Sequence, residues 1–220
     1  MQRATDEPTF ATGRVIRLAS LVEELGSPAA VTGRPAILAI DGRSSSGKTT
    51  LARRIEAMSL TCSAVHTDDI AWNHSRFGWA DLLTEHVLAP ARRGRPVSFL
   101  PPGWESHGRQ GRIEVPSGCD LLVVEGVGAG RQELRPMVDA VIWVETALET
   151  AEARDLARVG TPGGARSMQN MRDWLAEERP FLGAERTWEW ADAIVAGATD
   201  VAHDPTRDVV TLVISDHGGG

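Results

Sequence analysis

The chain has 220 residues, a formal net charge of −7 and ordinary shares of hydrophobic (42%) and charged (24%) residues, as expected for one compact globular domain. The negative charge argues against binding to nucleic acid polymers, which depends on clustered Lys and Arg, and no apolar run approaches the roughly 20 residues that span a bilayer. The first ten residues lack the apolar core of a secretory signal, so we expect a cytoplasmic protein. Cys62 and Cys119 form no metal-binding pattern and are expected to be reduced, buried thiols.

The predicted elements alternate between helix and strand. Residues 1–13 are expected to form a loose leader, followed by a helix over Arg14–Leu25, where apolar residues recur at helical spacing. Short apolar runs predict strands at Ala36–Ile40, Ala64–Thr67, Leu121–Val124, Ala140–Val144, Ala193–Ala196 and Val209–Ile214. Further helices are predicted at Thr49–Met58, Trp79–Arg93, Leu148–Val159 and Ser167–Glu178. Residues 96–116 are rich in Pro and Gly and are expected to form an irregular or hairpin insert.

This alternation predicts an α/β fold, a three-layer α/β/α sandwich with a mainly parallel, five-stranded sheet in a single domain over residues 1–220. In such sheets ligands bind beyond the carboxyl ends of the strands. Acidic residues stand at four of these predicted ends: Asp41, the pair Asp68–Asp69, Glu125 and Glu145. We therefore expect carboxylates to gather at one edge of the sheet.

A glycine-rich motif follows the first of these apolar strands. Gly42–Thr49 reads GRSSSGKT, which fits G-x-x-x-x-G-K-[ST] between a predicted strand and a predicted helix. Such a loop turns its backbone N–H groups toward phosphate oxygens, Lys48 reaches the β- and γ-phosphates of ATP, and the Thr49 hydroxyl binds Mg²⁺. The motif predicts a P-loop NTPase fold, and the alternative is a glycine-rich turn with an exposed Lys. The predicted nucleotide-binding residues are Gly42, Ser44, Ser45, Ser46, Gly47, Lys48, Thr49 and Thr50.

The chain resembles the uridine kinase branch of the P-loop kinases, which also includes phosphoribulokinase and a type of pantothenate kinase. The resemblance covers roughly residues 30–196 and rests on AIDGRSSSGKTTLA, HTDDIAW, LLVVEGVGAG and a later Arg-bearing segment. No internal N-K-x-D or LSGGQ-like segment points to a GTPase or a transporter motor instead. The resemblance implies phosphoryl transfer from ATP, with Asp68 as the base and a magnesium site formed by Thr49, Asp68 and Glu125. Asp69 is the alternative base, and either acid could instead cap a helix.

Two arginines are candidate catalytic groups. Arg154 and Arg158 are four residues apart, so a helix would place both on one face. The resemblance implies that they belong to a lid over residues 154–166 that closes over the phosphates and, with Lys48, neutralises transition-state charge. The alternative is a solvated face on which they pair with nearby acids.

The substrate-binding candidates lie after the acid pair and in the 96–116 insert, where aromatic faces could stack on a ring and His or Arg could bind hydroxyls. They are Asp69, Trp72, Trp79, Trp104, His107 and Arg109. Packing is the alternative for each, and it is the preferred interpretation for Trp174, Trp188 and Trp190. Uridine kinases carry Phe-Tyr where this chain has Ile70-Ala71, so the acceptor could be a nucleoside, a sugar-like alcohol or another small metabolite.

The sequence therefore predicts a kinase that uses ATP and Mg²⁺ to phosphorylate a small-molecule hydroxyl. Two other functions stay open, a regulatory nucleotide-binding NTPase and a nucleoside monophosphate kinase. No membrane or nucleic acid partner is expected, and a homodimer is compatible with the sequence.

Overall fold

The computed structural model describes residues 8–27, 33–58, 61–162, 164–165 and 167–215. Its strands are β1 (Thr9–Arg17), β2 (Ala36–Asp41), β3 (Cys62–His66), β4 (Val97–Phe99), β5 (Ile113–Val115), β6 (Leu121–Glu125), β7 (Ala140–Glu145), β8 (Ala193–Ala196) and β9 (Asp208–Ser215). Its α-helices are α1 (Leu18–Gly26), α2 (Lys48–Glu56), α3 (Thr67–Ala71), α4 (Ala80–Leu83), α5 (Ala89–Arg92), α6 (Pro102–Ser106), α7 (Leu148–Arg158) and α8 (Met168–Glu185). The remaining turns are the π-helix η1 (Thr84–Leu88) and the 3₁₀-helices η2 (Gln132–Met137) and η3 (Thr187–Glu189).

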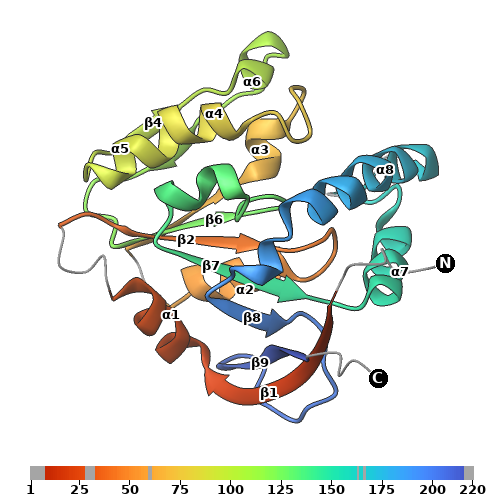
Figure 1. Cartoon of the computed structure of the whole chain (residues 1–220). Helices are drawn as coiled ribbons and strands as arrows, with labels where there is room; N and C mark the ends of the chain where they lie inside the picture. The colour runs from red at the N-terminus through yellow and green to blue at the C-terminus, as the bar shows by residue number, and fades with distance from the viewer. Residues whose placement is uncertain (1–7, 28–32, 59–60, 163, 166, 216–220) are drawn as a thin grey trace.

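Over these residues the main sheet has seven strands in the order β1-β9-β8-β7-β2-β6-β3 (Figure 1). The neighbouring strands β8, β7, β2, β6 and β3 run parallel, whereas β9 pairs antiparallel with β8 and with β1. The α/β class and the mainly parallel sheet are thus confirmed. The predicted number of five strands is wrong, because two antiparallel strands extend the parallel ones at one edge.

Helices cover both faces of the parallel strands, which explains why β2, β6 and β7 are apolar up to the acidic residue that ends each of them. In β2, Ile37 packs in the core beneath the α4–α5 region, whereas Ile40 packs toward α1 and α2. In β7, Trp143 packs against Leu182 of α8. Figure 1 shows the resulting arrangement, with α1 and α2 on one face and α3 to α6 and α8 on the other. The predicted three-layer sandwich is therefore confirmed.

The amino-terminal part differs from the prediction. Thr9–Arg17 is a strand, so the predicted helix begins at Leu18 and the loose leader ends before Thr9; residues 1–7 lie outside the described residues. β1 pairs with β9, from Thr9 opposite Ser215 to Arg17 opposite Asp208. This partner lies at the other end of the chain, so tertiary pairing overrides the local helical spacing.

The 96–116 insert forms a hairpin, which is one of the two structures expected for it. β4 and β5 pair antiparallel, with Phe99 opposite Ile113, and α6 lies between them in the chain. Phe99 also stacks on His86 of η1 at 4.5 Å between ring centroids, which attaches the hairpin to the long helical segment. Within the described residues no helix is long and apolar enough to cross a membrane.

Candidate active site

The P-loop, Gly42–Thr49, joins the carboxyl end of β2 to the start of α2. Gly42 and Gly47 adopt φ values of 148° and 111°, in the region that favours glycine. A Cβ atom on Gly42 would lie 2.5 Å from the Val144 carbonyl oxygen. Because α2 begins at Lys48, its first-turn N–H groups have no acceptor within the helix and add positive potential at the loop. The loop therefore has the backbone of an anion cradle.

Lys48 and Thr49 lie where the motif predicts. Lys48 is 7% exposed and its Nζ donates to the Arg43 carbonyl across the loop at 2.8 Å. Thr49 Oγ1 donates to Glu125 Oε1 at 3.1 Å, which joins the start of α2 to the end of β6. The ammonium group and the hydroxyl are thus fixed next to the cradle.

Helix α7 holds Ser45 in an unusual conformation. Ser45 has φ 55°, a left-handed geometry that costs a non-glycine residue about 1–2 kcal/mol. Arg154 Nη1 donates to the Ser45 carbonyl at 3.1 Å, and Arg158 Nη1 lies 3.2 Å from Ser45 Oγ. Ser45 Oγ in turn donates to Asp155 Oδ1 at 2.6 Å. The two arginines therefore share one face, which is turned toward the P-loop.

The acids at the strand ends divide into two kinds. Asp41 is fully buried and accepts backbone N–H bonds from Gly42, Gly128 and Gly130 at 2.7, 2.8 and 3.0 Å. Burial raises its pKa, and these hydrogen bonds oppose the rise. Asp41 thus connects the glycine loop after β6 to the P-loop. Glu145 instead bonds within its own strand, where its Oε2 accepts the Trp143 indole N–H at 2.8 Å. Of the four predicted strand ends, only those with Asp68 and Glu125 place carboxylates in the cavity described below.

Glu125 has the features of a magnesium ligand. Its Oε1 accepts from Thr49 and lies 2.7 Å from His66 Nδ1, while its buried Oε2 has no hydrogen-bond partner among the described residues. Burial alone would raise its pKa, but the hydrogen bond from His66 and the charge of Lys48 bring the net shift below the ordinary value. An ionised carboxylate with an unused oxygen beside a hydroxyl fits a cation that prefers oxygen ligands.

Magnesium needs few protein ligands, because it keeps several waters and also binds substrate phosphates. Within the described residues no group of three or more His, Cys, Asp or Glu is placed to hold a metal alone. Thr49, Glu125 and Asp68, which line one cavity, are the residues that fit this ion.

The acid pair on α3 separates into two environments. Asp68 faces an open cavity whose walls displace enough water to raise its pKa, and the nearby Glu125 charge raises it further. Asp69 points to the 96–116 insert, where its Oδ1 accepts from Arg109 Nη2 at 2.6 Å. Its backbone carbonyl accepts the Trp104 indole N–H at 2.7 Å.

Two cavities meet at the P-loop. The α3–α8 cavity, of about 530 Å³, lies on the side of Asp68 and Glu125. The α7–β8 cavity, of about 590 Å³, lies on the side of the carboxyl end of β8. Both are lined by Ser45, Lys48, Thr49 and Arg158. The cradle therefore has room for one group on each side.

The predicted aromatic candidates do not all reach a cavity. Trp72 lines the α3–α8 cavity, and His107 packs edge-on against it at 5.7 Å between ring centroids. Trp104 is buried, with the Arg109 guanidinium 3.7 Å from its ring centroid. Trp79 is 1% exposed and lies in the core. Packing, the alternative interpretation, describes Trp79 and Trp104.

Several cavity residues were missed by sequence reasoning. Asn73, Arg76, Asn170 and Trp174 line the α3–α8 cavity, although Trp174 was interpreted as core packing. Asn170 and Trp174 have only the helical spacing of α8 as a sequence signal, which core residues share, and Asn73 and Arg76 lie between α3 and α4, outside any such pattern. Gly197 was also missed: it lines the α7–β8 cavity, and a Cβ atom there would lie 1.8 Å from the Ser46 carbonyl oxygen. Buried Trp188 is core, as expected.

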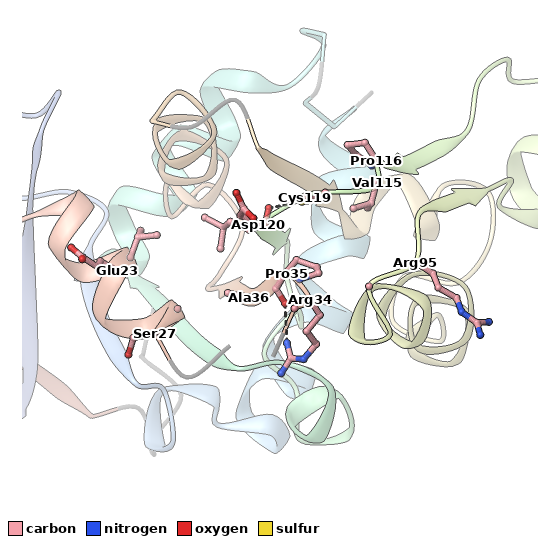
Figure 2. Close-up of a pocket in the computed structure, with 16 residues that line it drawn as sticks. Glu23, Ser27, Arg34, Pro35, Ala36, Arg95, Val115, Pro116, Cys119 and Asp120 are labelled. Carbon is pink, nitrogen blue, oxygen red and sulfur yellow. Dashed lines mark hydrogen bonds between the residues drawn. The ribbon is translucent and has the colours of Figure 1, made fainter. Parts of the chain in front are cut away.

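A third cavity, of about 600 Å³, lies at the opposite end of the sheet, between α1 and the segment after β5 (Figure 2). Its charged groups do not converge. Arg34 is held by Asp139 through two hydrogen bonds of 2.7 Å, and Figure 2 shows Arg95 pointing away from the other labelled residues. The amino ends of β2 and β6 border this cavity, so it is remote from the P-loop.

No protein-family model matches the chain, and no curated protein matches it significantly. Among solved structures it is similar to a protein described as a possible uridine kinase from Bacillus stearothermophilus, with TM-score 0.48, 19% identity, and coverage of 80% of this chain and 98% of that chain. It is also similar to a protein described as a fructose transport system kinase from Silicibacter sp. TM1040, with TM-score 0.46, 18% identity, and coverage of 80% and 90%. Both similarities concern the backbone fold.

Proposed function

We propose that this chain is an ATP-dependent kinase that transfers the γ-phosphate to a hydroxyl group of a small-molecule acceptor. The observation that carries the proposal is the pair of cavities that meet at Lys48 and Thr49. Only the α3–α8 cavity also contains Asp68 and Glu125. One side of the cradle therefore has the groups that act on an acceptor, and the other side has room for the rest of the nucleotide.

On the donor side, the P-loop amides and Lys48 bind the β- and γ-phosphates, and the nucleoside lies in the α7–β8 cavity between α7 and the end of β8. Arg158 lines both cavities, so its guanidinium can stabilise the negative charge that develops on the phosphate oxygens during transfer. Arg154 supports this wall by bonding the Ser45 carbonyl.

Thr49, Glu125 and Asp68 would hold Mg²⁺. When bound, the ion neutralises charge on the phosphate oxygens and orients them. Glu125 is kept ionised by His66 and Lys48, and Thr49 is held beside it.

On the acceptor side, Asp68 takes the proton from the attacking hydroxyl as the new O–P bond forms and the bond between the γ-phosphorus and the departing ADP breaks. Its carboxylate lines the cavity that would hold the acceptor, within the site where a general base is needed. Asp69 is already paired with Arg109, which supports Asp68 rather than Asp69 in this role. Trp72 and Trp174 offer apolar faces to the body of the acceptor.

A nucleoside monophosphate kinase would need free cationic groups for the phosphate of its acceptor. Arg76 lines the cavity, but its Nη1 bonds the Asp173 carbonyl at 2.8 Å and pairs with Glu177. This engagement weighs against an acceptor that is already phosphorylated.

A regulatory NTPase would hydrolyse ATP slowly and show no dependence on an alcohol.

The test is a screen of ADP release from Mg-ATP over nucleosides, nucleoside monophosphates, sugars and amino alcohols, with product analysis for phosphate on the acceptor. We expect one class to accelerate ADP release and to become phosphorylated in equal amount. Calorimetry with Mg-ADP provides the prior check, because absence of a heat of association would remove the basis of the proposal. Slow hydrolysis that no acceptor changes would favour the regulatory NTPase.

A further inference from the structure

We propose that Glu178 of α8 is a positioning residue that holds the first half of the P-loop in its phosphate-binding shape. The inference rests on the proposed function, because it assigns how the cradle of that site is kept in place. It concerns a residue at the last position of the predicted Ser167–Glu178 helix, which the motif does not include.

The carboxylate of Glu178 is committed to the loop backbone. The residue is 2% exposed, and its Oε1 accepts the backbone N–H of Ser44 at 2.5 Å. A buried carboxylate is unfavourable unless it receives hydrogen bonds or faces opposite charge. Burial raises the pKa of Glu178, whereas the Lys48 charge and the Ser44 N–H favour its ionised form. The contact therefore joins a buried carboxyl group of α8 to the backbone of the loop.

The position of Ser44 gives this contact its effect. On one side, Arg43 supplies the carbonyl that accepts from Lys48 Nζ. On the other side, Ser45 adopts the left-handed conformation that α7 supports. Fixing the amide between them restrains both the lysine's acceptor and the turn that follows. Glu178 and α7 thus hold consecutive residues of the loop from two different helices.

Helix α8 places this carboxylate on the same face as the acceptor wall. Asn170, Trp174 and Glu178 are spaced at four-residue intervals, so they lie on one face of the helix. The first two line the α3–α8 cavity, and the third meets the P-loop. Leu182, the next residue in this series, is buried in the core against β7. The helix is therefore anchored in the core, and its inner face spans from the loop to the cavity.

A negative charge beside a phosphate cradle could instead oppose the binding of phosphate. The two roles predict opposite changes in nucleotide affinity when Glu178 is replaced. A positioning residue strengthens nucleotide binding, so its removal weakens the affinity. A competing carboxylate would weaken binding, so its removal would improve the affinity.

The experiment compares Glu178→Ala, Glu178→Met and Glu178→Gln by calorimetric titration with Mg-ADP. Loss of the buried hydrogen bond that holds the Ser44 amide predicts an affinity about 10-fold below wild type for Ala and Met. Gln keeps an acceptor oxygen of the same reach and is expected to stay within about threefold. Glu185→Ala is the matched control, because Glu185 lies on the same helix and its Oε2 accepts the backbone N–H of Gln132 at 2.8 Å, outside both P-loop cavities.

Thermal melting without nucleotide separates this role from a general structural one. If Glu178 only stabilises the fold, the folded variants should melt at a lower temperature but bind Mg-ADP with unchanged affinity. Unchanged or tighter binding by Glu178→Ala and Glu178→Met would overturn the proposal. If both variants fail to fold, hydrogen exchange of the wild-type protein provides the test. The Ser44 amide is expected to exchange slowly, and exchange at the rate of an unprotected amide would overturn the proposed contact. Wild-type protein that binds no Mg-ADP would instead refute the proposed function.

Discussion

The two walls of the cleft are built in different ways. The wall proposed to bind phosphate is one continuous segment, Gly42–Thr50, at the junction of β2 and α2. The proposed acceptor wall combines α3 and the turn after it, the glycine loop after β6, and the start of α8. The first wall depends on backbone N–H groups whose direction is set by local dihedral angles, whereas the second depends on side chains brought together by packing. Phosphate binding can therefore be inferred from a motif, but acceptor identity cannot.

Lys48→Ala breaks the phosphate-binding wall and is expected to have the largest effect. Removal of a buried cation from the site should cost about 4 kcal/mol of transition-state stabilisation, or about a 1,000-fold loss in kcat/KM for ATP. The measurement is the steady-state rate of ADP formation with the acceptor found by screening. A loss below tenfold would show that Lys48 makes no essential contact with the transferring phosphate.

Trp79→Ala tests the support of the acceptor wall. Trp79 is buried in the core and the Arg131 guanidinium lies 4.0 Å from its ring centroid, so truncation should lower the free energy of unfolding by about 3 kcal/mol. Urea denaturation measures this loss. Trp72→Ala is the comparison, since Trp72 lines the cavity and should mainly raise the KM for the acceptor. A change in acceptor KM with Trp79→Ala at unchanged stability would make Trp79 a binding residue after all.

Asp68→Asn separates the walls, because it removes the proposed base and leaves the P-loop residues unchanged. Transfer should fall about 100-fold, or about 2.7 kcal/mol, while the affinity for ADP without Mg²⁺ stays near wild type, because Asp68 is also a proposed Mg²⁺ ligand. Asp69→Asn provides the contrast, and the larger loss in that variant would reassign the base.

Asp139→Asn tests a site far from both walls, where Asp139 holds Arg34 beside the third cavity. Burial alone would raise the pKa of Asp139, but hydrogen bonds from Arg34 and from the Ile37 N–H lower it overall. The substitution should lower the free energy of unfolding by about 2 kcal/mol at neutral pH. A depressed pKa means that this contribution is present above the ordinary carboxyl value and is lost as pH falls through the lowered pKa.

The check is the difference in unfolding free energy between wild type and Asp139→Asn as a function of pH. The difference should shrink in acid, and the transfer rate at neutral pH should stay unchanged. A difference that is independent of pH would show that packing, rather than the ion pair with Arg34, accounts for the loss.

Much of the parallel core was predictable because its signals are local. The apolar runs at Ala36–Ile40 and Ala140–Val144 lie within β2 and β7, and the motif between strand and helix indicated where the loop would lie. The helical spacing over Arg14–Leu25 misled at its start, because β9 pairs with Thr9–Arg17 from the far end of the chain. The roles of the site residues stay predictions.

The sequence by itself determined the phosphate cradle, since glycine dihedral angles, a helix start and one lysine are properties of consecutive residues. Only the tertiary structure decided which side chains share the cleft. It separated Asp68 from Asp69, brought Trp174 into the cavity and set Glu178 against Ser44. The physical reason is that these contacts join segments distant in the chain, and their geometry depends on how buried helices pack on the sheet rather than on local residue preferences.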